Sequence, residues 1–243
     1  PQIIKSFIRP FNLNELPLIR LRSFVLSNSL KQYLLIDMHH IVADWLTVQL
    51  LRQEIAAFLK REALPEVDYH FKDYVMLERS RAFRRKLKVS EDYWINQMSG
   101  DLPVLKLPSD VVEKSSQKMF AGKNYTFTID QEILEKARVL AEAEHITVYA
   151  FMLSAFYLFL NGLTGAKDMI IGLAVSGRMH PDLKKIAGVF TNMMPVRLKM
   201  KEDYTTSQLL NYTQNQLNQG LKNQEYPLDQ LIAKVLKKST AKE

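Results

Sequence analysis

The sequence contains no cysteine among its 243 residues. This absence excludes structural disulfides, thiolate zinc sites, iron–sulfur clusters and a cysteine nucleophile. The chain also lacks an apolar run of about 18 residues, and its most apolar stretch, residues 148–160, is too short to span a bilayer. Because no basic and then apolar leader opens the chain, we expect a cytoplasmic protein without a membrane partner.

Several familiar motifs of enzyme sites are also missing from the sequence. There is no GxGxxG, no P-loop, no GxSxG and no HExxH, so nucleotide-binding, serine-hydrolase and zinc-protease functions have no support. What is present is an ordinary globular composition, with 47% hydrophobic and 24% charged residues.

The positive charge is concentrated in one segment. Lys and Arg number 33 against 26 Asp and Glu, so the net charge is 33 − 26 = +7, and residues 72–88 carry most of the excess. Within that segment four basic residues repeat at helical spacing: Arg81, Arg84, Arg85 and Lys88. They form either a solvated helix face or a docking patch for an acidic partner. Nucleic acid is less well supported, because aromatic residues are not interleaved with the basic ones.

Hydrophobic periodicity predicts strands interleaved with helices. In the first half we expect strands at 19–25 and 33–38 around a turn at 27–29, the second strand being buried and central. We expect helices at 47–60, with Thr47 as the N-cap, and at 72–88 and 91–98.

A break with prolines at 103 and 108 follows, and the pattern then restarts. Beyond it we expect strands at 123–129, 168–175 and 193–199 and helices at 130–144, 147–162 and 205–222. The fold class is therefore α/β or α+β, in two lobes that divide near residue 105.

Residues 38–44, with the sequence MHHIVAD, stand where a buried strand ends and a helix is about to begin. Adjacent imidazoles in such a turn point in different directions, so one of His39 and His40 can do chemistry while the other packs. A satisfied core histidine is the competing interpretation. A metal site has little support, because the remaining histidines show no ligand spacing.

This stretch resembles the HHxxxDG signature of the condensation domains of nonribosomal peptide synthetases, and other segments agree in order. The similar segments are PFNL (10–13), PLIR (17–20), YHFKDY (69–74), YW (93–94), VSGRMHP (175–181), IAGVFTN (186–192) and NQEYPL (223–228). Epimerisation domains usually lack the last two, and heterocyclisation domains replace the histidines with aspartates, so both fit less well.

The resemblance implies a chloramphenicol-acetyltransferase-like fold, two-lobed and V-shaped with a central tunnel. It implies that His40 is the catalytic histidine and His39 its structural neighbour. It further implies a structural salt bridge of Asp44, for which Arg178 is the candidate partner. Trp45 and Asn192 are expected to face the substrate tunnel.

By the same resemblance, the domain joins a donor acyl or peptidyl thioester to an acceptor aminoacyl thioester in the biosynthesis of peptide antibiotics and other secondary metabolites. Both substrates are held on carrier proteins by 4′-phosphopantetheine, so the implied partners are carrier domains and an adjacent adenylation domain. No cofactor bound directly and no metal are expected. The alternative is a catalytically silent relative that recruits partner proteins.

Two departures from the family pattern bear on activity. Trp45 stands where the signature has glycine, and it either narrows the tunnel beside His40 or packs into the core. The opening and closing motifs of the family are absent. We therefore expect residues 1–105 to be the remainder of the N-terminal lobe and residues 106–243 an incomplete C-terminal lobe.

Overall fold

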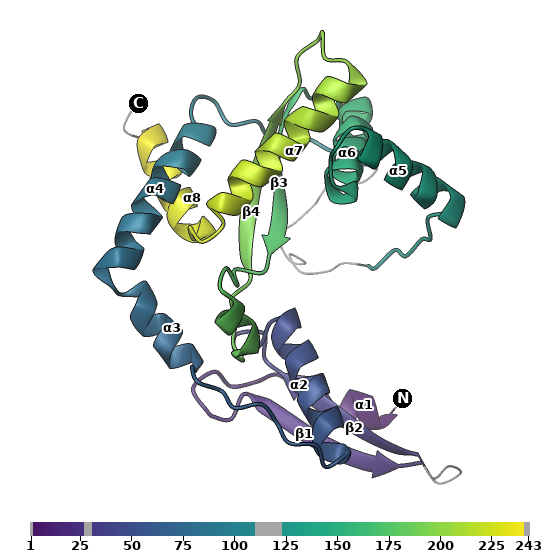
Figure 1. The fold of residues 1–243 in the computed structure, drawn as a ribbon, viewed down its shortest axis with the longest axis vertical. Helices are drawn as coiled ribbons and strands as arrows, with labels where there is room; N and C mark the ends of the chain where they lie inside the picture. Colours follow the sequence, from purple (N-terminus) through teal and green to yellow (C-terminus); the bar gives the residue numbers. More distant parts are fainter. Residues whose placement is uncertain (1, 27–30, 110–122, 241–243) are drawn as a thin grey trace. The chain divides into compact units, whose positions relative to one another are not determined.

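The structure is a computed structural model that describes residues 2–26, 31–109 and 123–240. The predicted turn at 27–29 lies outside the described residues. Figure 1 shows the order of the elements along the chain. The helices are α1 (Gln2–Phe7), α2 (Trp45–Leu59), α3 (Phe71–Glu78), α4 (Arg81–Gln97), α5 (Gln131–Ala143), α6 (Val148–Thr164), α7 (Thr206–Lys222) and α8 (Leu228–Thr240). The strands are β1 (Ile19–Val25), β2 (Gln32–Met38), β3 (Asp168–Val175) and β4 (Asn192–Lys199), and a short 3-10 helix, η2, covers Pro181–Lys185.

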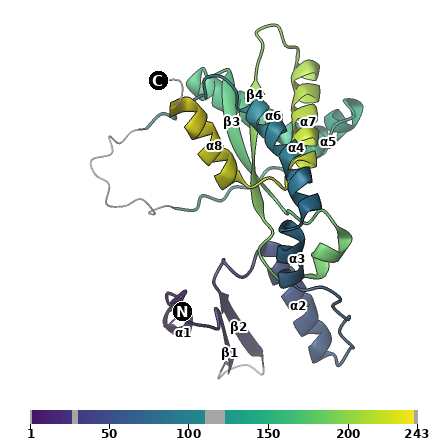
Figure 2. The ribbon, with the colours of Figure 1, turned by 90° about the vertical axis from the view of Figure 1, so that its left-hand side faces the viewer.

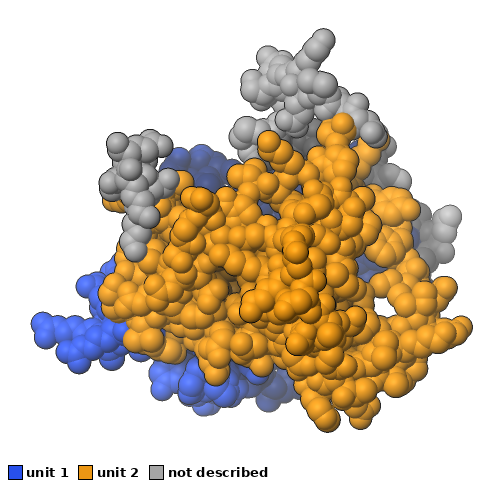
Figure 3. Space-filling model, turned by 90° about the horizontal axis from the view of Figure 1, so that it is seen from above, with its two compact units in different colours: residues 1–85, 176–192 blue, residues 86–175, 193–243 orange. Residues whose placement is uncertain are grey.

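The chain divides into two compact units, which Figure 3 colours separately. Unit 1 contains residues 1–85 and 176–192, and unit 2 contains residues 86–175 and 193–243. Unit 1 thus combines the first third of the chain with the segment that connects β3 to β4. The predicted lobe boundary near residue 105 concerns the complete two-lobed fold and stays a prediction.

In unit 1, β1 and β2 form an antiparallel hairpin with Ile19 opposite Met38 and Val25 opposite Gln32. The prediction of a buried central strand at 33–38 is wrong, since Tyr33 and Leu34 are exposed. The physical reason is that β2 pairs only with β1 among the described strands, so one of its edges has no neighbour.

The helix after the double histidine begins earlier than predicted. Asp44, not Thr47, is its N-cap, and the Asp44 carboxylate accepts the backbone N–H of Thr47 at 2.8 Å. The prediction of a Thr47 cap is wrong because Thr47 lies within the first turn of the helix, where its hydroxyl makes tertiary contacts. An aspartate before the first turn is also among the strongest N-cap residues.

The basic segment forms two helices rather than one. α3 ends at Glu78, and Ser80 begins α4 by accepting the N–H of Phe83 on its hydroxyl at 3.1 Å. A serine that caps a helix in this way competes with continued helix through its position. α4 then runs without interruption to Gln97, so the separate helix predicted at 91–98 is its second half.

Unit 2 has its core between the β3–β4 pair and its helices. Figures 1 and 2 show β3 and β4 side by side, with α6 next to α7, and α5 contacts α6. The core is made of large side chains with almost no exposure, among them Trp94, Tyr157, Met169, Met194 and Leu198.

Thr147 is the N-cap of α6, since its hydroxyl accepts the Ala150 N–H at 3.1 Å. The helix extends beyond the predicted end at 162 to Thr164, where Gly165 adopts a left-handed φ of 71°. Such a left-handed residue is the usual way for a helix to end.

Two further expectations differ from the structure. Residues 123–129 do not form the predicted strand, because Tyr125 and Phe127 are exposed and no described strand pairs with this segment. The sequence patterns also missed α1 and α8. Among the described residues no single helix is long and apolar enough to cross a membrane, and α5 and α6, bent by 108°, reach that composition only as a pair.

Candidate functional site

The double histidine lies in a tight turn of unit 1 between the end of β2 at Met38 and the start of α2 at Trp45. The backbone N–H of His39 donates to the Leu18 carbonyl at 3.1 Å, which ties the turn to the residue before β1. The N–H of Val42 donates to the His39 carbonyl at 3.1 Å and closes the turn. The chain therefore reverses direction here with its backbone held at both ends.

His39 is half-buried and packs against its own loop. Its Nδ1 accepts the Ile41 N–H at 3.0 Å, so Nδ1 carries no proton and the neutral ring is protonated at Nε2. The ring also meets the edge of Phe11, with centroids 6.0 Å apart. His39 thus supports the shape of the turn.

His40, by contrast, is exposed, and no hydrogen bond to its side chain is found in the described part of the chain. His40 lines a cavity of about 420 Å³ together with Trp45 and Arg52. Of the two histidines, His40 is therefore the one whose ring nitrogens are available to a ligand.

Asp44 anchors the other end of the turn. Its side chain is 1% exposed, and its carboxylate accepts the Thr47 hydroxyl at 2.9 Å and the Phe190 N–H at 3.1 Å. Burial favours the protonated acid, but the hydrogen bonds from Thr47, Phe190 and Arg178 outweigh it and lower the pKa of Asp44. The carboxylate is therefore ionised in the folded protein at neutral pH.

Arg178 is the partner of this buried carboxylate. Its Nη2 lies 3.0 Å and 3.2 Å from the two oxygens of Asp44, so the two residues that the sequence analysis paired are paired in the structure. The same Nη2 lies 3.1 Å from the Thr47 hydroxyl and 3.1 Å from the Gly188 carbonyl.

The rest of the guanidinium holds the loop of residues 176–192. Nη1 donates to the carbonyls of Leu183 and Ile186, the latter at 2.6 Å, and the guanidinium carbon lies 4.1 Å from the centre of the Phe190 ring. Of the three guanidinium nitrogens, Nε is the one that is buried without a hydrogen-bond partner among the described residues. The arginine thus ties one loop both to itself and to the start of α2.

Thr47 is a residue of this network whose role the sequence analysis missed. Its hydroxyl oxygen accepts the Gly188 N–H at 3.0 Å and lies 2.7 Å from the Gly188 carbonyl. Thr47 therefore joins the first turn of α2 to the backbone of a loop 141 residues later. The available signal in the sequence was a threonine three positions after Asp44, but this spacing predicts only a local capping contact and not the contact with Gly188.

Two glycines allow the loop to approach this closely. Gly177 has a φ of 64°, and a Cβ there would collide with the Phe190 carbonyl. A Cβ at Gly188 would overlap the ring of Phe71, which packs at 80° against Phe190 with centroids 5.2 Å apart. A side chain at Gly177 would disturb the folding of the loop on itself, and one at Gly188 would disturb its packing against Phe71 at the start of α3.

Trp45 is the first residue of α2, and its side chain is 69% exposed. The indole is therefore not part of the core, which removes the core-packing interpretation for this structure. It lines the same cavity as His40. Asn192, the other residue expected at the substrate tunnel, is half-buried at the start of β4 and lines neither of the two cavities of unit 1 described here.

The four residues of the predicted basic face are all exposed on α4, but they differ in their surroundings. Lys88 is paired with Glu91 at 2.7 Å and with Asp92 at 3.0 Å, and these hydrogen bonds raise its pKa. For Arg81, Arg84 and Arg85, no ion pair is found among the described residues. The charge available to a partner is therefore that of the three arginines.

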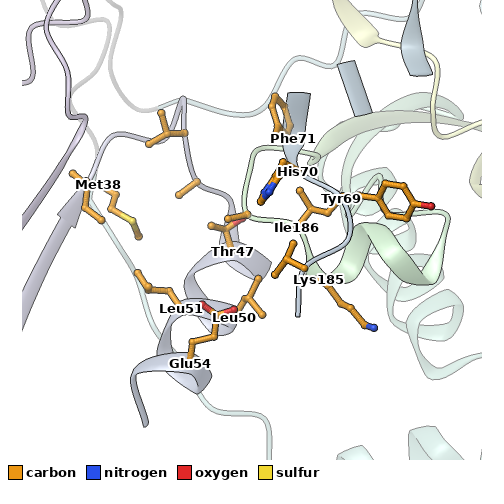
Figure 4. A pocket seen from close by; sticks show the side chains of 15 residues that line it. Met38, Thr47, Leu50, Leu51, Glu54, Tyr69, His70, Phe71, Lys185 and Ile186 are labelled. Carbon is orange, nitrogen blue, oxygen red and sulfur yellow. The ribbon is translucent and has the colours of Figure 1, made fainter. Parts of the chain in front are cut away.

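A second cavity of about 360 Å³ shares Met38, Ala43 and Leu51 with the first. Figure 4 shows Thr47, His70 and Ile186 gathered around it, with the Lys185 ammonium directed away. Neither His39 nor His40 lines it. Within the described ranges, no three His, Asp or Glu side chains are grouped to hold a metal ion.

Comparisons with known proteins agree on one family. The family model for the condensation domain matches residues 1–243. The chain is 34% identical over 232 residues to bacitracin synthase 1 of Bacillus licheniformis, covering 96% of this chain and 4% of the relative. It is 30% identical over 234 residues to tyrocidine synthase 2 of Brevibacillus parabrevis, covering 96% of this chain and 6% of the relative.

Solved structures show the same fold. The condensation domain of the monacolin K polyketide synthase MokA matches with a TM-score of 0.75 at 20% identity, covering 89% of this chain and 51% of that one. A four-domain nonribosomal peptide synthetase bound to AMP and glycine matches with a TM-score of 0.80 at 21% identity, covering 96% of this chain and 18% of that one. The fold is thus the chloramphenicol-acetyltransferase-like fold of these domains.

The match covers only part of each relative. The chain spans about 4% and 6% of the length of the two curated synthases, and about half of the MokA condensation domain. The double histidine, the buried Asp44–Arg178 pair and the match along all 243 residues lead to one conclusion. The chain belongs to the condensation-domain family of the nonribosomal peptide synthetases.

Proposed function

We propose that this domain forms an amide bond between a donor acyl or peptidyl thioester and the amine of an acceptor aminoacyl thioester, each carried by a carrier protein on 4′-phosphopantetheine. The observation that supports this most is the placement of His40. His40 is exposed and lines a cavity, while the turn that bears it is anchored through Asp44.

The reaction requires little beyond orientation and a proton acceptor. The acceptor nitrogen attacks the thioester carbonyl, the C–S bond breaks as the C–N bond forms, and the amine proton leaves as the thiolate departs. An α-amino group titrates near pH ~8, so a fair fraction is already neutral at neutral pH. His40 takes the proton or positions the amine, and a general base of this kind contributes roughly 10²–10⁴-fold.

The anchors of the turn have a positioning role in this proposal. Asp44 and Arg178 do not line up as acid and base, because both are buried and paired with each other. They fix the start of α2 and therefore the direction of the His40 side chain. Holding two tethered reactants in a productive geometry accounts for much of the rate of such reactions.

A second candidate function rests on Trp45. Its indole lines the cavity of His40, where the family signature has glycine, and it reduces the space open to a substrate. In that case the domain is catalytically silent and recruits carrier proteins through its surface, the exposed arginines of α4 being the candidate contact.

The test is peptide formation with carrier proteins loaded with donor and acceptor. We expect product from the parent chain and a rate lower by roughly 10²–10⁴-fold in His40→Ala. Carrier binding and thermal stability, measured on the same preparations, should be the same in both. Carrier binding without product in the parent chain would favour the recruitment function, and a His40→Ala variant at the parent rate would remove this residue from the mechanism.

A further inference from the structure

The cavity beside His40 is built mostly from α2 and the end of β2. The residues that line it include the apolar Ile36, Met38, Val48, Leu51 and Trp45. A cavity of about 420 Å³ with apolar walls and a few polar groups is the usual form of a small-molecule site. The inference drawn from it rests on the proposed function and concerns the substrate that the cavity accepts.

The charges along this wall do not balance. Asp37 is neutralised by Arg20, whose Nη1 lies 2.9 Å from its carboxylate, and Asp44 is neutralised by Arg178 at 3.0 Å. Arg52 also lines the cavity, and no ion pair to it is found in the described ranges. Leaving His40 aside, the wall therefore has one uncompensated charge, which is positive.

Helix geometry places this charge relative to the indole. Trp45 and Arg52 are seven residues apart on α2, so they lie on one side of the helix, about 10 Å apart along its axis. Between them the wall is apolar, with Val48 and Leu51 contributed by the same helix. A matching ligand has an apolar body next to the indole and a negatively charged group at its far end.

We propose that the cavity prefers a substrate that carries an anionic group, and that Arg52 is the residue that determines this preference. The anion is a carboxylate on the aminoacyl or acyl group, or the phosphate of the pantetheine arm. An arginine is suited to both, because its guanidinium donates two parallel hydrogen bonds to carboxylate or phosphate oxygens.

Binding can be measured without catalysis because the two tryptophans of the chain differ. Trp45 lines the cavity and is 69% exposed to solvent. Trp94 lies in the core of unit 2 and is 2% exposed. Ligand in the cavity should therefore change the fluorescence of Trp45, and calorimetry on the same chain gives an independent affinity. The probes are two pairs: glutamyl against glutaminyl N-acetylcysteamine thioester, and phosphopantetheine against pantetheine.

We expect the anionic member of at least one pair to bind roughly three- to tenfold more tightly to the parent chain, less so as salt is added. The pair that shows the difference identifies the source of the anion. Arg52→Gln should remove the preference and Arg52→Glu should reverse it. Arg79→Gln is the matched control, since it removes the same charge from an exposed residue of unit 1 that lines neither cavity.

Equal affinity within both pairs, no binding of any probe, or a preference that survives Arg52→Gln would overturn the proposal. Failure of the proposed function has a different result. If the charge preference is found but loaded carriers give no product, the site is correct and the amide-forming function is wrong. If product forms while the Arg52 variants leave the affinities for the probes unchanged, the amide-forming function is correct and the anion preference is wrong.

Discussion

Asp44 and Arg178 are 134 residues apart in the sequence and form an ion pair in which each side chain is 1% exposed. A charge pair removed from water in this way depends on both partners and on the hydrogen bonds around them. Here the surrounding donors and acceptors belong to the first turn of α2 and to the loop of residues 176–192. The pair therefore fixes the segment that carries His40 to a part of the chain far away in sequence.

Asp44→Asn should destabilise unit 1 by about 3–5 kcal/mol, because it leaves the buried Arg178 charge without its counter-charge. The measurement is chemical denaturation, with Glu132→Gln as the matched control. Glu132 pairs with Lys136 at 2.6 Å, but both side chains are at least 70% exposed, so its loss should cost less than about 1 kcal/mol. Unchanged stability of Asp44→Asn with lost turnover would instead give Asp44 a direct role in the reaction.

Thr47 should be replaceable by serine but not by valine. Valine keeps the shape and removes the hydroxyl that serves Asp44 and both backbone groups of Gly188, so we expect a loss of about 1–3 kcal/mol. Serine keeps the hydroxyl, which accepts the Gly188 N–H and has one proton to donate, and should stay within about 1 kcal/mol of the parent. A larger loss in the serine variant than in the valine variant would show that the methyl group, not the hydroxyl, is what matters.

Glu91 should make unit 2 sensitive to acid. Hydrogen bonds from Lys234, Lys88 and the Tyr226 hydroxyl lower the pKa of Glu91 to about 2 from its usual 4.5. A group whose pKa is lowered by folding stabilises the fold above its unfolded pKa, and this contribution is lost as the pH falls through the folded pKa. Stability should therefore decline by about 1–2 kcal/mol between pH ~4.5 and ~2. Glu91→Gln should be less stable at neutral pH and should lack this part of the decline, and an identical pH profile would contradict the assignment.

Trp45→Gly should raise the rate of condensation while leaving the melting temperature nearly unchanged. The indole is 69% exposed, so its removal leaves no cavity in the core, while it opens space beside His40. Because a small displacement of reacting groups costs about 10²-fold, relief of an obstruction should be worth roughly ten- to hundredfold. Turnover and melting temperature are measured on the same variant, and a destabilised protein with no gain in rate would rule out the obstruction.

The arginines of α4 should contribute to carrier binding in a way that Lys88 does not. The paired replacement Arg84→Gln and Arg85→Gln removes two exposed charges for which no ion pair is found in the described ranges, so we expect weaker carrier affinity and a smaller salt dependence. Lys88→Gln is the control, since Glu91 and Asp92 already engage that ammonium. If carrier affinity is independent of salt, these arginines form an ordinary solvated helix face and not a docking patch.

Local patterns in the sequence were sufficient for most elements of the fold. The strand at 19–25 follows from its place before a polar turn, and the helices that begin after Thr147 and Thr205 follow from periodicity and a capping residue. Two of the errors occurred where two local signals competed. Ser80 divided one predicted helix into α3 and α4, and Asp44 capped the helix that had been assigned to Thr47.

The sequence by itself determined the family, the double histidine before α2 and, through the family resemblance, the pairing of Asp44 with Arg178. The resemblance also implied a structural role for His39, but only the tertiary structure showed its contact with the Ile41 N–H, the cavity at His40, the exposure of Trp45 and the link from Thr47 to Gly188. The physical reason is range. Strand and helix periods and caps act over a few residues, whereas the Thr47 and Arg178 contacts join segments more than 130 residues apart.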